Sequence, residues 1–100
     1  MNGYVIADVT VTDSEMYADY VSKAGSILKK YGGKVIIWAT KGKGESFDIM
    51  EGDWNPNILA VIKFKSVKQA KKWYNSPEYA DIIDIRFKSA SAKLNIFEGV

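Results

Sequence analysis

The chain of 100 residues contains neither cysteine nor histidine. The absence of cysteine excludes disulfides, thiol nucleophiles and thiolate metal sites. The absence of histidine removes the commonest general base, the commonest metal ligand and the usual proximal haem ligand. Any acid–base chemistry would fall to an aspartate, a tyrosine or a lysine. We therefore expect neither a metal nor a cofactor.

A strong charge of either sign and long apolar runs are also missing. The 14 basic and 12 acidic residues leave a net charge of only +2. Nucleic-acid binding needs a larger basic excess gathered on one face. No apolar stretch approaches the length of a membrane span, and the N-terminal residues have the pattern of a strand, not of a signal peptide. We expect a soluble, cytoplasmic protein without a nucleic-acid or membrane partner.

The composition is that of an ordinary globular domain. Hydrophobic residues make up 47% of the chain and charged residues 26%, which predicts a single folded domain over residues 1–100. A domain of this size buries only a moderate fraction of its surface alone, so oligomerisation is a natural source of further burial.

Hydrophobic periodicity and turn residues divide the chain into strands and helices. Strands are predicted at 3–11, 34–40, 47–51, 58–65 and 92–98, with 47–51 pairing back onto 34–40 across a turn at 41–46. Helices are predicted after the capping sequences Thr12–Glu15, Ser66–Gln69 and Ser76–Glu78, the first ending at Gly32-Gly33. This order is βαββαβ, the ferredoxin-like α+β arrangement with helices on one face of an antiparallel sheet.

Several predicted strands are apolar on both faces, 34–40 most clearly. A monomer with helices on one face only would expose a large apolar patch. Packing the open faces of two sheets together would cover it, so we expect a homodimer of the dimeric α/β-barrel kind.

The helix that starts at Pro77 places a charged residue among apolar ones. Ser76 is expected to cap this helix, and Arg86 falls on the same stripe as Ile82 and Ala90. An isolated buried charge is costly. Arg86 therefore either reaches water at the sheet edge, pairs with a carboxylate of the protein, or binds an anionic ligand.

Several other residues are candidates for a site. The carboxylates that Arg86 could meet are Asp8 in the first strand and Asp53 in the loop before 58–65, and both are also candidate general bases. Asp53 lies beside a large apolar ring that could perturb its pKa, although an Asx turn explains it equally well. The aromatic side chains that could line a pocket, or simply pack in the core, are Tyr17, Tyr20, Trp54, Trp73, Tyr74 and Tyr79.

These motifs resemble one known family over essentially the whole chain. They are Gly3-Tyr4, Tyr31-Gly32-Gly33, Glu51-Gly52-Asp53-Trp54, the run Trp73–Tyr79, Arg86 and Glu98-Gly99. Together they are similar to the domain-of-unknown-function family 1330, within the dimeric α/β-barrel superfamily. The resemblance implies a ferredoxin-like subunit and a homodimer with sheets face to face, and it brings no established activity. The bulky apolar strand at 34–40 departs from the family pattern.

Three functional hypotheses follow. The first is a dimer that binds a small apolar or aromatic acid through Arg86, between helices and sheet. The second is a cofactor-independent monooxygenase or isomerase acting on an aromatic or enolisable substrate, with Asp53 or Asp8 as base and Trp73 or Tyr79 orienting the ring. The third is a structural or regulatory dimer without a pocket. A cavity that holds both a carboxylate and Arg86 favours the enzyme, and a cavity with Arg86 alone favours binding.

Overall fold

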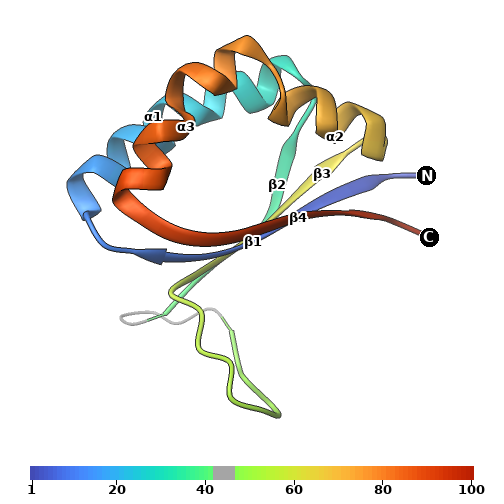
Figure 1. Cartoon of the computed structure of the whole chain (residues 1–100). Coiled ribbons are helices and arrows are strands. Elements are labelled where there is room, and N and C mark those ends of the chain that lie inside the picture. Colours follow the sequence, from blue (N-terminus) through green and yellow to red (C-terminus); the bar gives the residue numbers. More distant parts are fainter. Residues whose placement is uncertain (42–46) are drawn as a thin grey trace.

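The computed structural model describes residues 1–41 and 47–100, in which three helices cover one face of a four-stranded antiparallel sheet (Figure 1). The strands are β1 (Gly3–Val11), β2 (Lys34–Thr40), β3 (Ile58–Phe64) and β4 (Ala90–Glu98), in the order β2-β3-β1-β4. The helices are α1 (Ser14–Lys30), α2 (Val67–Tyr74) and α3 (Pro77–Ser89). The predicted ferredoxin-like α+β fold is confirmed. In the described part of the chain, no helix has the length and apolarity required to cross a membrane.

The predicted strand at 47–51 is wrong. These residues are irregular, and β2 pairs directly with β3. Most of the predicted turn, residues 42–46, lies outside the described residues. Since β2 already has its neighbour in β3, the intervening segment is not needed to complete the sheet. Residues 47–57 instead extend away from the sheet on the side opposite the helices (Figure 1).

Each helix begins at a side chain that caps its first turn. Asp13 accepts a hydrogen bond from the amide of Met16 at 3.1 Å, so the aspartate rather than Thr12 caps α1. Ser66 caps α2 in the same way, and Ser76 accepts from the amide of Tyr79 at 3.1 Å to cap α3. These oxygens satisfy amides that have no partner within the helix.

Replacing Ser76 with alanine is expected to lower the free energy of unfolding by about 1 kcal/mol, because the amide of Tyr79 loses its acceptor at a buried helix end. Urea denaturation measures the change. Ser26→Ala, at an exposed position inside α1, is the control and should change stability little. An unchanged unfolding midpoint for Ser76→Ala would show that another group caps α3.

The sheet has one covered face and one open face. On the covered face, Val5 and Val9 of β1 belong to the hydrophobic core with the buried rings of α1, α2 and α3. On the open face, Ile6, Val61 and Ile37 are neighbours across three adjacent strands. Ile37 is 46% exposed, and Phe97 on the same face is 52% exposed. The open face therefore carries an uncovered apolar row.

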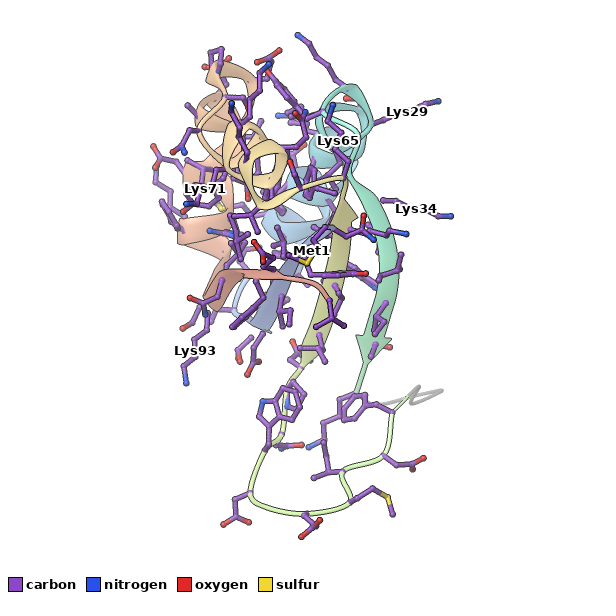
Figure 2. The ribbon with its side chains drawn as sticks, turned by 90° about the vertical axis from the view of Figure 1, so that its right-hand side faces the viewer. Met1, Lys29, Lys34, Lys65, Lys71 and Lys93 are labelled. Carbon is purple, nitrogen blue, oxygen red and sulfur yellow. The ribbon has the colours of Figure 1, made fainter. Side chains whose placement is uncertain are left out.

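Lysine side chains surround this framework without gathering on one face. Lys29 and Lys34 point outward on one side of the molecule, and Lys71 and Lys93 point outward on the opposite side (Figure 2). The small positive excess is thus dispersed, as expected of an ordinary solvated surface.

An ion pair and hydrogen bonds between side chains connect α1 and the residue that follows it to α3. The Lys30 ammonium pairs with the Glu78 carboxylate, and the Tyr31 hydroxyl donates to the same carboxylate at 2.8 Å. Further along, the hydroxyls of Tyr20 and Tyr79 share a hydrogen bond of 2.6 Å. The two helices thus form an arch over the sheet (Figure 1).

Candidate functional site

A cavity of about 310 Å³ lies between α1 and the covered face of the sheet. Its floor is formed by Ala7 of β1 and Ala60 of β3, which are partners across the two central strands. Larger side chains flank both positions along their strands, so the alanine pair leaves a depression where a core would normally be filled. Ala24 and Gly25 of α1 are also small and form part of the roof. The space therefore arises from small residues that face one another.

The cavity opens between α1 and the edge strand β2. Val35 and Trp38 of β2 line it and are each 44% exposed, and Val21 of α1 lines it and is 39% exposed. The other walls are predominantly hydrophobic. A ligand that enters here would leave water for an apolar surrounding.

Arg86 of α3 lines this cavity and is only 5% exposed. Its Nε has no hydrogen-bond partner, and no carboxylate of residues 1–41 and 47–100 lies within ion-pairing distance of it. The guanidinium does lie 5.3 Å from the ring centroid of Phe87. Burial excludes the interpretation in which Arg86 extends into water. The protein thus holds a buried cation against an apolar space.

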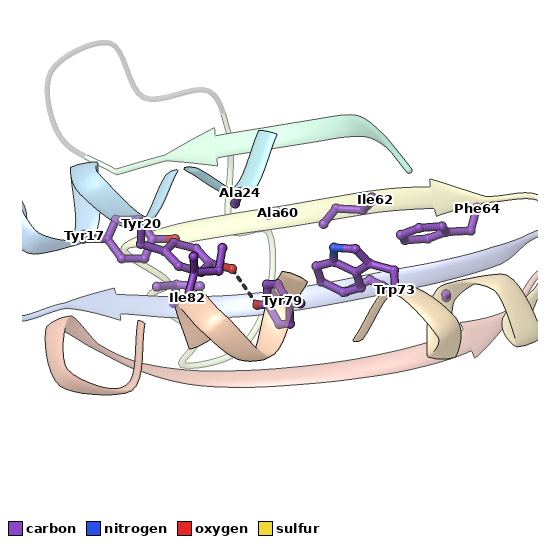
Figure 3. Packing of buried hydrophobic residues seen from close by; sticks show 13 residues of the cluster. Tyr17, Tyr20, Ala24, Ala60, Ile62, Phe64, Trp73, Tyr79 and Ile82 are labelled. Carbon is purple, nitrogen blue, oxygen red and sulfur yellow. Dashed lines mark hydrogen bonds between the residues drawn. The ribbon is translucent and has the colours of Figure 1, made fainter. Parts of the chain in front are cut away.

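Trp73 of α2 also lines the cavity and is 1% exposed. Its indole Nε1 has no hydrogen-bond partner. The ring packs against Phe64 and Tyr79, with centroid distances of 5.6 Å and 4.5 Å. Figure 3 shows the indole nitrogen on the side of the ring that faces Ile62 of β3. Trp73 is therefore a second donor without an acceptor.

Three tyrosines next to Arg86 remain neutral at physiological pH. Burial raises the pKa of Tyr17 to about 12. Burial also raises the pKa of Tyr20 and of Tyr79, and the proximity of Tyr79 raises the pKa of Tyr20 further. The positive charge of Arg86 opposes these shifts in pKa without cancelling them. The three neutral hydroxyls can thus donate or accept hydrogen bonds, as those of Tyr20 and Tyr79 do with each other.

The structure brings some of the predicted site residues together. Arg86, Trp73 and Tyr17 line the cavity. Tyr79 is fully buried beside it, with its ring against Trp73 and its hydroxyl bonded to Tyr20, which also lines the cavity.

The predicted acids and Trp54 lie elsewhere. Asp8 follows Ala7 in β1 and so points to the open face, where its carboxylate accepts a hydrogen bond from the indole of Trp54 at 2.8 Å. Asp53 is exposed in the loop. The pairing of Asp8 or Asp53 with Arg86 is therefore not formed. Among the residues described, no group of three acidic side chains is placed to hold a metal ion.

The sequence did not lead us to predict that Ala7 and Ala60 form the floor of the cavity, or that Trp38 lines it. The available signal was the arrangement Val5-Ala7-Val9 in one central strand and Ile58-Ala60-Ile62 in the other. The small residue occupies the middle core-facing position in both strands, and their register sets these positions side by side.

Solved structures share this fold at low sequence identity. A protein of unknown function from Rhodopseudomonas palustris is 17% identical with a TM-score of 0.76, covering 99% of this chain and 82% of its own. SnoaB, a cofactor-independent oxygenase from Streptomyces nogalater, is 6% identical with a TM-score of 0.70, covering 99% and 93%. A dabb family protein with a ferredoxin-like fold from Mesorhizobium loti is 8% identical with a TM-score of 0.68, covering 99% and 97%. These likenesses concern the fold.

At the level of sequence, no curated protein matches the chain. One family model does match, over residues 2–100, which is nearly the whole length and includes every residue of the cavity. This chain belongs to the domain-of-unknown-function family DUF1330.

Proposed function

We propose that the protein is a homodimer that binds small apolar or aromatic acids in the cavity beneath α1. The observation that carries this proposal is the buried guanidinium of Arg86, which faces an apolar cavity without a carboxylate from the described residues. In a ligand with an acid group and a hydrocarbon body, the acid group would pair with the guanidinium and the hydrocarbon would contact the apolar walls.

The physical argument rests on the cost of a buried charge. A cation removed from water needs a counter-charge or hydrogen-bond acceptors nearby. A carboxylate is the planar acceptor that matches a guanidinium, through two parallel hydrogen bonds. The remaining walls then bury the hydrocarbon part of the ligand, and the cavity volume is at the lower end of the range for small-molecule sites.

Thermal melting with matched ligands tests this proposal. Benzoate and 2-naphthoate are expected to raise the melting temperature, whereas benzamide and 2-naphthamide, which have the same rings without the charge, are expected not to. At a ligand concentration 100 times the Kd, the gain in the free energy of unfolding would be about 2.7 kcal/mol. Equal shifts from acids and amides would contradict a role for the guanidinium.

The dimer is expected to form through the open face of the sheet, because the described residues leave the apolar row there exposed. Sedimentation at low micromolar concentration should give one species of twice 11.2 kDa. Ile37→Glu places a charge in that row and should give a monomer. Met16→Glu, at a similarly exposed position on α1, should remain dimeric. A soluble monomer of the unchanged protein would contradict the proposal.

The alternative is a cofactor-independent monooxygenase or isomerase on an aromatic or enolisable substrate. It is supported by the shared fold of SnoaB and by a buried cation that would stabilise an oxyanion. The cavity supplies no carboxylate base from the described residues, so such a substrate would have to arrive already ionised. Oxygen uptake with acidic phenols and 1,3-diketones tests this alternative. The third hypothesis, a dimer without a pocket, is disfavoured by the cavity itself.

A further inference from the structure

We infer that the acid is a straight-chain fatty acid, with its carboxylate at Arg86 and its hydrocarbon tail in an apolar trough that continues beneath α1 beyond the cavity. This inference rests on the proposed function, because it takes the same charged residue as the anchor. It narrows the ligand class from small apolar or aromatic acids to acids with a long, flexible chain.

A second, more open depression of about 500 Å³ adjoins the mouth of the cavity. Three side chains line both spaces, namely Tyr17, Val21 and Trp38. The residues that line only the second depression are Val11, Ser14, Ala18, Ser22 and Ile58. The two spaces therefore meet at shared side chains, and together we call them the α1 trough.

The second depression continues the cavity along the same two central strands. On β1, the lining passes from Val9 in the cavity to Val11 in the second depression. On β3, it passes from Ala60 to Ile58. Each step is two residues, which keeps the side chains on the covered face of the sheet. Because the strands are antiparallel, both steps lead in the same direction.

Helix α1 roofs the trough along most of the length of the helix. Its backbone lies close to that of α3 and farther from the strands beneath it. The lining positions on α1 extend from Leu28 in the cavity to Ser14 in the second depression, about 21 Å of helix. Ala18 and Gly25, one in each part, add little bulk to the roof. The space beneath α1 is therefore elongated.

The side chains of the second depression favour a hydrocarbon. Val11, Ile58 and Trp38 offer apolar surface, and no charged side chain is among the described residues that line it. The hydroxyl of Ser22 already donates to the backbone carbonyl of Asp19 at 2.7 Å. A flexible chain of methylenes can also follow the twist of the strands, which a rigid fused ring cannot. The trough therefore fits an alkyl tail better than a larger aromatic acid.

Arg86 lies near the junction of the two spaces. Its positive charge opposes the rise in the pKa of Tyr17, and Tyr17 lines both spaces. A carboxylate at Arg86 would therefore have its chain beside Tyr17, from where the chain passes Val21 and Trp38 into the second depression.

A pair of acids that differ only in chain length tests the trough. Hexanoate and dodecanoate have the same head group, and the second chain is twice as long. In the unchanged protein, dodecanoate is expected to bind at least about tenfold more tightly, since full burial of one methylene gives roughly a fourfold gain in affinity. Calorimetric titration below the micellar concentration of either acid measures both Kd values.

Ala18→Glu and Ser26→Glu are matched variants for this experiment. Both positions are exposed on α1, and both changes add one negative charge. Ala18 lines the second depression, whereas Ser26 lines neither space. In Ala18→Glu, the preference for dodecanoate over hexanoate is expected to fall about tenfold, because the tail would have to desolvate the added carboxylate. Ser26→Glu should keep the preference of the unchanged protein.

Nuclear magnetic resonance of methyl groups locates the tail in the unchanged protein. Ile58 lines only the second depression, whereas Ile37 lies on the open face of the sheet. Ile58→Val and Ile37→Val identify the two δ1 methyl signals by their loss. The Ile58 signal is expected to shift with dodecanoate but not with hexanoate, and the Ile37 signal with neither.

The outcomes separate this inference from the proposed function. Equal affinities for the two fatty acids would overturn the trough and leave the proposed function standing. So would a preference that Ala18→Glu leaves intact while the Ile58 signal does not move. If neither fatty acid nor 2-naphthoate binds, the proposed function is overturned, and this inference with it. A preference lost in Ala18→Glu but kept in Ser26→Glu, or an Ile58 signal that moves only with dodecanoate, supports the inference.

Discussion

Replacing Arg86 with methionine is expected to abolish the binding of apolar acids while leaving the protein folded. The methionine retains an unbranched apolar stem but removes the charge that would receive the carboxylate. Loss of one partner of a buried, hydrogen-bonded charge pair costs about 2–5 kcal/mol, which is roughly a thirtyfold to several-thousandfold loss of affinity. Calorimetric titration with 2-naphthoate measures it.

The stability of the same variant distinguishes the two partners that Arg86 could have. No described carboxylate pairs with Arg86, so its removal strands no buried anion, and the free energy of unfolding should stay level or rise. Lys88→Met, which removes a charge from an exposed position of α3, is the control and should leave affinity unchanged. A destabilisation of about 3–5 kcal/mol in Arg86→Met would instead mean that a carboxylate of the protein holds the guanidinium.

Replacing Ala60 with leucine is expected to remove acid binding by a different route, and to stabilise the protein. The added three carbons would occupy the cavity floor, where about 310 Å³ is free. Burying them contributes up to about 2 kcal/mol at roughly 0.8 kcal/mol for each carbon. Chemical denaturation should therefore show a higher free energy of unfolding, whereas titration should show a lower affinity for 2-naphthoate.

Ala80→Leu is the matched control for that experiment. It adds the same atoms at an exposed position of α3, away from the cavity, and should leave both stability and affinity nearly unchanged. A large loss of stability in Ala60→Leu would show that the space above the sheet is not available for a side chain. Retained binding would place the acid elsewhere.

Much of the fold followed from local patterns. The polar side chains at Asp13, Ser66 and Ser76 mark helix starts because each has an oxygen that reaches the amide three residues on. The alternation in 3–11 and 58–65 identified strands for the same local reason. The segment 47–51 was misread, since its pattern resembles a strand but strand pairing depends on which neighbours remain available.

The candidate site was predictable only in part. The position of Arg86 on the apolar stripe of α3 follows from helical periodicity, whereas its burial was one of three alternatives. The cavity depends on register between β1 and β3, which sets Ala7 opposite Ala60 and which no local pattern reveals. Asp8 was one candidate partner of Arg86, because the first strand could have been buried on both sides. The strand pleat instead turns Asp8 to the open face, where Trp54 donates to it.

The contact between α1 and α3 at Glu78 has a consequence for how the protein would respond to acid. Hydrogen bonds from Lys30 and then Tyr31 lower the pKa of Glu78 to about 2. A carboxylate with a lowered pKa stabilises the fold fully above its ordinary pKa, and this contribution is lost progressively as the pH falls from about 4.5 toward 2. A free aromatic acid has an ordinary carboxyl pKa of about 4, and a guanidinium beside it would lower that pKa in the same way. In acid, the charge of a bound acid and the ion pair between α1 and α3 would therefore be lost over the same range of pH.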